Sequence, residues 1–97
     1  MKKVFRFKSK VWLYPGMSGW HFVGVPKKES DVIKKGILKK AGFGSVPVIV
    51  TVGKTVWETS IFPDKRTGTY LLPLKVEVRK REAITIDEIV SLSIEIV

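Results

Sequence analysis

The chain has 97 residues, a net charge of +9 and a hydrophobic content of 44%, which fits one globular domain. The absence of cysteine excludes disulfides and thiolate metal sites, and a single histidine leaves no other metal site or cofactor site to propose. No apolar run approaches the ~18–20 residues that span a bilayer, and charges interrupt any signal-peptide core. We therefore expect one cytoplasmic β-barrel domain over residues 1–97, with no membrane partner.

The first segment, residues 3–14, alternates apolar and polar positions and then shifts register. This pattern predicts a strand with a bulge near Ser9 and Lys10. Residues 15–19 have the composition of a loop. A second strand is expected over residues 20–26, where aromatic and β-branched residues alternate.

The next segment, residues 27–41, is the best helix candidate in the chain. Ser30 or Asp31 can cap its start, and apolar residues recur at helical spacing. Gly36 weakens its middle by about 1 kcal/mol relative to alanine. The glycines at positions 42 and 44 are suited to end it.

A hairpin is predicted from residues 46–52 and 55–62, two β-prone runs joined by Gly53 and Lys54. Glycine in the first position of a two-residue loop is what a type II′ turn needs. Pro63 is expected to end the second strand, since it cannot donate to a continuing ladder.

The C-terminal third contains two further alternating segments, residues 70–78 and 90–96. Strict alternation predicts a strand in each. About six strands and one covering helix indicate a mostly β fold, a small closed barrel.

Several short motifs together resemble the family called domain of unknown function 1905 (DUF1905). The matching residues are Trp20, 22–23, 25–26, Gly53, Trp57, 59–63, 68–70, 72–75 and 78–80. The resemblance implies a small β-barrel with a short second helix at residues 75–82, which conflicts with the period-two pattern there. We follow the resemblance. It also implies a turn before the last strand, where Asp87 and Glu88 replace a glycine–aspartate pair and Asp tolerates the left-handed region.

Aromatic and polar residues gather within and around the motifs that carry this resemblance. A groove lined by indole rings and edged by cations would suit a flat or anionic ligand. The opposite interpretation is that the rings fill the core, which is the commoner fate of aromatics in strands. Our leading hypothesis is a non-enzymatic binding module for an unidentified small ligand, with contacts from Trp20, Trp57, Thr59, Tyr70, Lys75 and Arg79.

An alternative follows from the uneven placement of charge. Residues 1–14 carry five positive and no negative charges, and residues 27–40 carry six positive and two negative. Such an excess attracts polyanions, nucleic acid above all. The candidate contacts are Lys2, Lys3, Arg6, Lys8, Lys10, Lys34, Lys35, Lys39 and Lys40. The competing explanation is a solvated lysine surface, because the absence of Asn, Gln and Cys is typical of a thermophile.

A second alternative is a small hydrolase-type enzyme. It would need Ser18 or Ser60 beside His21, the only histidine in the chain. No third residue is evident to orient the pair. The oligomeric state is not predicted by the sequence.

Overall fold

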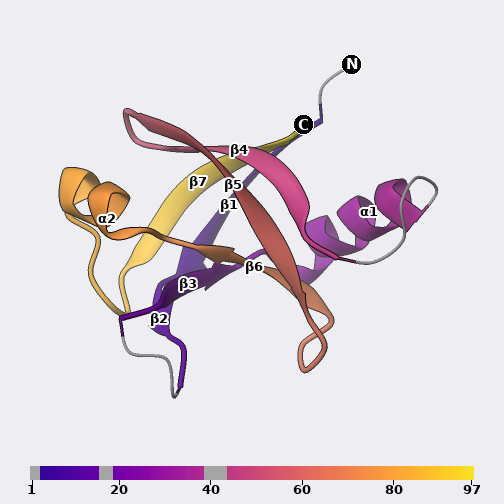
Figure 1. Cartoon of the computed structure of the whole chain (residues 1–97), viewed down its shortest axis with the longest axis horizontal. Helices are drawn as coiled ribbons and strands as arrows, with labels where there is room; N and C mark the ends of the chain where they lie inside the picture. The colour runs from indigo at the N-terminus through magenta and orange to yellow at the C-terminus, as the bar shows by residue number, and fades with distance from the viewer. Residues whose placement is uncertain (1–2, 16–18, 39–43) are drawn as a thin grey trace.

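The computed structural model describes residues 3–15, 19–38 and 44–97. Within these ranges the elements are β1 (Val4–Lys10), β2 (Trp12–Leu13), β3 (His21–Gly24), α1 (Lys27–Leu38), β4 (Val46–Val52), β5 (Thr55–Asp64), β6 (Thr69–Pro73), α2 (Val76–Glu82) and β7 (Ile89–Ile96). The described strands form one antiparallel sheet in the order β1-β7-β4-β5-β6-β3-β2. Figure 1 shows a strongly curved sheet, with α1 and α2 near opposite ends of the long axis.

The sheet is an open half-barrel, so the prediction of a closed, six-stranded barrel was wrong in this detail. Its outer strands, β1 and β2, are separated along the chain by Val11 alone, yet no ladder joins them within the described residues. The Val11 N–H donates to the Glu88 carbonyl, and the Val11 carbonyl accepts from the Asp87 N–H. The expected single strand is thereby divided, since the chain leaves β7 at Lys10 and pairs with β3 from Trp12.

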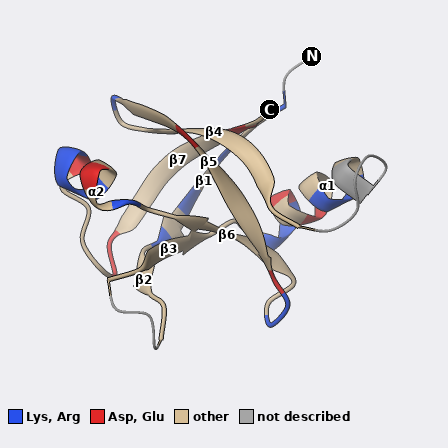
Figure 2. Cartoon of the chain, in the orientation of Figure 1, with Lys and Arg blue, Asp and Glu red and all other residues tan. Residues whose placement is uncertain are grey.

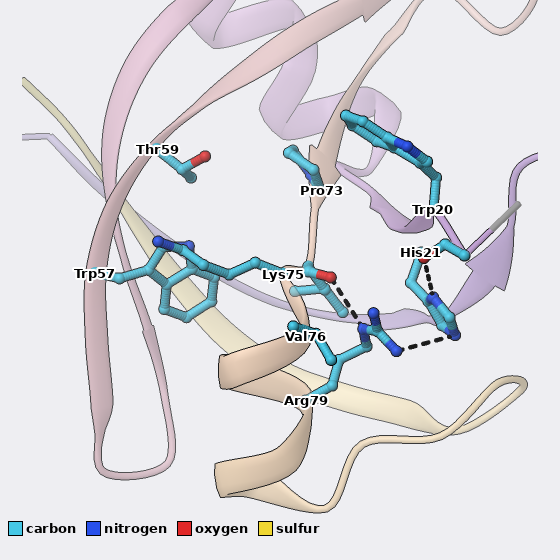
Figure 3. A pocket seen from close by; sticks show the side chains of 10 residues that line it. Trp20, His21, Trp57, Thr59, Pro73, Lys75, Val76 and Arg79 are labelled. Atoms are coloured by element: carbon cyan, nitrogen blue, oxygen red, sulfur yellow. Dashed lines mark hydrogen bonds between the residues drawn. The ribbon is translucent and has the colours of Figure 1, made fainter. Parts of the chain in front are cut away.

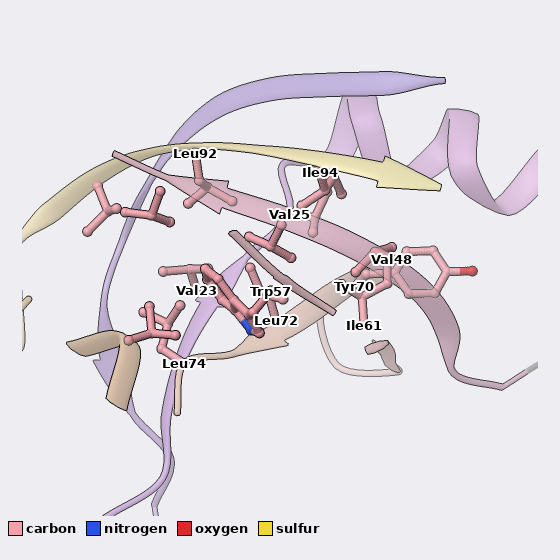
Figure 4. Close-up of a cluster of buried hydrophobic side chains, with 14 of the residues drawn as sticks. Val23, Val25, Val48, Trp57, Ile61, Tyr70, Leu72, Leu74, Leu92 and Ile94 are labelled. Atoms are coloured by element: carbon pink, nitrogen blue, oxygen red, sulfur yellow. The ribbon is translucent and has the colours of Figure 1, made fainter. Parts of the chain in front are cut away.

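The β4–β5 hairpin confirms the local prediction. Every residue of β4 has a partner in β5, from Val46 opposite Ile61 to Val52 opposite Thr55. Gly53 has a φ of 57°, as the first position of a type II′ turn requires. Pro63 does not end β5, which continues to Asp64. Inward side chains of this hairpin join those of β7, β3 and β6 in the core (Figure 4), including Val48, Ile61, Leu72 and Ile94.

Helix α1 begins at Lys27, so neither Ser30 nor Asp31 has the predicted capping position. Ser30 is fully buried instead. Its hydroxyl donates to the Val25 carbonyl at 3.0 Å and accepts from the Tyr70 N–H at 3.0 Å. This serine therefore fastens α1 to β6. The predicted end of the helix at residue 41 lies outside the described residues.

The segment after β6 is helix α2, as the family resemblance implied, and the alternating pattern was wrong beyond Pro73. Val78 is the buried residue of α2. The far end of α2 is held by a hydrogen bond of 2.6 Å from the Thr55 hydroxyl to the Glu82 carboxylate. That carboxylate also lies where a Cβ at Gly53 would be, so the hairpin tip and α2 fit closely together.

The last strand, β7, lies where the alternation predicted it. Before it, Asp87 has a φ of 71°, so the turn expected from the resemblance is present without a glycine. The Glu88 carboxylate accepts from the Thr85 N–H at 3.0 Å. Neither described helix has both the length and the apolar character needed to cross a membrane.

Candidate functional site

A split in the sheet creates the site. Strand β5 pairs with β4 from Thr55 to Ile61, but it pairs with β6 only from Phe62 to Asp64. Beyond Leu71, β6 continues along β3, with Pro73 opposite Phe22. The two neighbouring strands therefore diverge. A pocket of about 360 Å³ lies between β5, the end of β6, the start of β3 and α2 (Figure 3).

Five of the six residues proposed as ligand contacts line this pocket: Trp20, Trp57, Thr59, Lys75 and Arg79. The sixth, Tyr70, does not, which corrects the sequence-based assignment. Its side chain is only 5% exposed and belongs to the core, because it shares the inward parity of Leu72 and Leu74. Burial raises the pKa of its phenol above the ordinary value of 10.0.

Trp57 forms one wall of the pocket and is 9% exposed. Its indole N–H is buried and has no hydrogen-bond partner in the described part of the chain. Buried indole N–H groups usually find an acceptor, and leaving a buried donor unpaired costs about 1–3 kcal/mol. The nitrogen is sealed from solvent, so an acceptor atom in the cavity would reach this N–H only after a shift of the indole ring or of a side chain that covers it.

Trp20 stands across the pocket from Trp57 (Figure 3) and is 49% exposed. Its ring stacks on Phe22 with 5.9 Å between centroids. Trp12 and Tyr14 lie outside the pocket and stack on each other, with 5.5 Å between ring centroids. The pocket thus has one sheltered and one exposed indole wall.

Arg79 of α2 is held in place by two hydrogen bonds. Its Nε donates to the Leu74 carbonyl at 3.0 Å, and its Nη1 lies 3.4 Å from His21 Nε2. His21 Nδ1 lies 2.9 Å from the Gly19 carbonyl, which can only accept, so Nδ1 carries a proton. Nε2 of the neutral ring then accepts from Arg79. Among the described residues, the other N–H groups of the guanidinium have no partner.

The electrostatics of the pocket are one-sided. No Asp or Glu is among its lining residues. The described ion pairs, Lys27–Asp31 and Arg66–Asp64, lie elsewhere, so Lys75 and Arg79 have no carboxylate partner in the ranges that the structure covers. Two unpaired cations beside apolar walls attract an anion more strongly than the same charges would in open water.

His21 also lines the pocket, although it was not among the predicted ligand contacts. Its contact with Arg79 joins residues 58 positions apart, so no local sequence pattern predicts it. The position of His21 does not support the hydrolase alternative. Ser60 lies on the face of β5 opposite Trp57 and Thr59, and Ser18 lies outside the described residues. No cluster of metal-ligating side chains occurs in the described ranges.

The cations proposed for nucleic acid are divided between separate places. Lys3, Arg6, Lys8 and Lys10 lie on or beside β1, and Lys34 and Lys35 lie on α1. Figure 2 shows β1 crossing the middle of the molecule and α1 at one end. The candidate cations therefore belong to two separate elements. Lys2, Lys39 and Lys40 lie outside the described residues.

The single curved antiparallel sheet, with its split beside α2 and a pocket walled by indoles, defines the class: a small, mostly β domain. The chain belongs to the family of the domain of unknown function DUF1905, whose model matches residues 7–94. All the pocket residues named above fall within that match. No curated protein matches the chain.

Proposed function

We propose that the protein is a binding module that holds a small anion with a flat apolar part in the split between β5 and β6. One observation carries the proposal. Among the residues that the structure describes, the buried Trp57 N–H has no acceptor, Lys75 and Arg79 have no ion-pair partner, and no carboxylate lines the pocket beside them. An anionic oxygen would supply the missing countercharge, and the Trp57 N–H would become a further donor to it once the indole ring shifts toward the cavity.

The side chains divide the work of recognition. Arg79, fixed by Leu74 and His21, offers its unused N–H groups for charge-assisted hydrogen bonds. The exposed Lys75 adds charge at the rim. The indoles of Trp20 and Trp57 offer flat apolar surface, and the volume falls within the range of small-molecule sites. A planar ring that carries a carboxylate or a phosphate has this combination of features.

Calorimetric titration with phenyl phosphate, benzoate and the neutral isostere benzamide tests the proposal. We expect at least one aryl anion to bind at least tenfold more tightly than benzamide, a difference of about 1.4 kcal/mol or more. Equal affinity for the neutral and charged ligands, or no binding of either anion, contradicts it.

The same titration with variants assigns the binding to the pocket. Trp57→Phe removes the unpaired N–H and should weaken anion binding about tenfold, and Arg79→Met should weaken it further. Trp12→Phe is the matched control, because Trp12 lies outside the pocket. If Trp12→Phe has as large an effect as Trp57→Phe, the assignment to this pocket is wrong.

A further inference from the structure

The outer face of β1, β7 and β4 carries a second arrangement of polar groups, which shares no residue with the pocket. In the paired register, Arg6 lies opposite Ser93, and Ser93 lies opposite Thr51. Lys8 lies opposite Ser91 in the next row. These five residues line a shallow hollow of about 400 Å³. Two cations and three hydroxyls therefore meet across three adjacent strands.

Strand periodicity explains why these polar side chains share one face of the sheet. Phe5 and Phe7 of β1 pack against the core, so the alternate residues Arg6, Lys8 and Lys10 face outward. Consecutive members of this row are separated by roughly 6.8 Å along the strand. The hydroxyls on β7 form a parallel row in the neighbouring strand, about 5 Å away.

The charge of this face is uncompensated where the cations lie. Within the described residues, Arg6, Lys8 and Lys10 take part in no ion pair. The carboxylate of the paired β7 row, Glu95, lies opposite Val4 and Ile49, at the end of the face, and has an interaction of its own. Arg6, Lys8 and Lys10 therefore lie opposite residues of β7 other than Glu95.

We propose that this face binds the phosphodiester backbone of single-stranded nucleic acid without regard to base sequence. Evenly spaced cations on one strand suit the regular repeat of phosphates along an extended chain, and the hydroxyls can donate to phosphate oxygens. The hollow is also lined by Phe7 and Leu92, but both side chains pack against the core. The outward residues Arg6, Lys8, Thr51, Ser91 and Ser93 include no aromatic ring, so they offer bases no platform for stacking. The hollow is open and shallow, which suits a polymer crossing the sheet.

The test is fluorescence anisotropy of a labelled oligothymidylate of 20 nucleotides, titrated with the whole chain at several salt concentrations. The double variant Arg6→Ala/Lys8→Ala should bind at least tenfold more weakly. Its plot of log affinity against log salt should be shallower by about 1.4, because each phosphate contact contributes roughly 0.7 for single strands. The hydroxyl variant Ser91→Ala/Ser93→Ala should lose affinity a few-fold with an unchanged slope.

The control changes the same net charge elsewhere. Lys28→Ala/Lys35→Ala removes two exposed cations of α1 and should leave affinity within twofold. An equal loss in this control would mean that binding reports net charge alone and would overturn the proposal. So would the absence of binding by the parent chain at about 50 mM salt, a concentration at which phosphate contacts are strong. Arg79→Met should bind the oligonucleotide normally, so this proposal and that for the pocket fail or succeed separately.

A membrane surface presents similar chemistry and is tested in parallel. Vesicles that contain phosphatidylserine should compete poorly with the oligonucleotide. If they bind through Arg6 and Lys8 while the oligonucleotide does not, the face recognises anionic lipid, and the proposal is overturned.

Discussion

The two sides of the sheet differ in how completely their strands are paired. From β1 through β7 and β4 to β5 the ladders are continuous, and every residue of β4 has a partner in β5. On the other side, β6 leaves β5 for β3 after Leu71, and the opening contains an unpartnered indole N–H and cations without ion pairs. The continuous ladders give the first side its paired backbone, whereas the split is a departure from regular strand pairing, of the kind that folds tend to tolerate where they bind a ligand.

The strongest test of this contrast is a cavity in the continuous side. Ile94 of β7 is fully buried, so Ile94→Ala should lower the free energy of unfolding by about 2–5 kcal/mol. Ile89→Ala is the matched control in the same strand, because Ile89 is 64% exposed. Urea denaturation measures both, and similar losses would show that the burial of Ile94 does not determine its contribution.

A smaller effect is expected where α1 joins β6. Ser30→Ala removes an acceptor from the Tyr70 N–H and a donor to the Val25 carbonyl, both in the interior. The unpaired backbone groups should cost about 1–3 kcal/mol of unfolding free energy. Ser91→Ala, at an exposed position of β7, should change it by less than about 0.5 kcal/mol.

In the split, removing the unpartnered indole N–H should change the free energy of unfolding little. Trp57→Phe loses packing area but also removes a buried, unpartnered donor, so the two effects offset and the unfolding free energy should change by less than about 1 kcal/mol. The same substitution is expected to reduce anion affinity. Chemical denaturation with and without phenyl phosphate separates the two effects, and a loss above about 2 kcal/mol without ligand would contradict an unpaired N–H.

The smallest effect concerns pH, at the end of β5 where it still pairs with β6. Burial alone would raise the pKa of Asp64, but hydrogen bonds from the Arg66 side chain and backbone, together with its charge, hold this pKa below the usual 3.8. A depressed pKa in the folded state means that ionised Asp64 contributes stability above about pH 4. This contribution is lost as the pH falls through the lower folded-state value.

Thermal melts of the parent and Asp64→Asn should therefore differ slightly at pH 6 and converge near pH 2. A difference that stays constant across this range would show that the Asp64–Arg66 interaction does not stabilise the fold through ionised Asp64.

The same two sides differ in how far the sequence predicts them. The β4–β5 hairpin depends on alternation and one glycine, which are local, and it forms as expected. Leu74 and Val78 mislead because their spacing of four fits a helix while their even parity also fits a strand. The alternation alone therefore predicted a strand that continued beyond Pro73, whereas the family resemblance placed α2 correctly. Trp57 and Thr59, which alternate along β5, both line the pocket.

The rest of the site required contacts between distant segments. His21 reaches Arg79 only because β3 runs beside the end of β6, just before α2 begins. Tyr70 was proposed as a ligand contact because it is part of the motif, but its side chain lies in the core and not in the pocket. Val11, where the chain passes from one edge of the sheet to the other, carried no signal beyond a shift in register.

The close fit between Glu82 and Gly53 links the two sides mechanically. The Thr55 hydroxyl holds the Glu82 carboxylate against the glycine, just before the left-handed Ala83 that ends α2. Arg79 lies on that helix, one turn before Glu82. The hairpin tip thus anchors the helix that carries Arg79 from outside the pocket, while the guanidinium itself is oriented by Leu74 and His21.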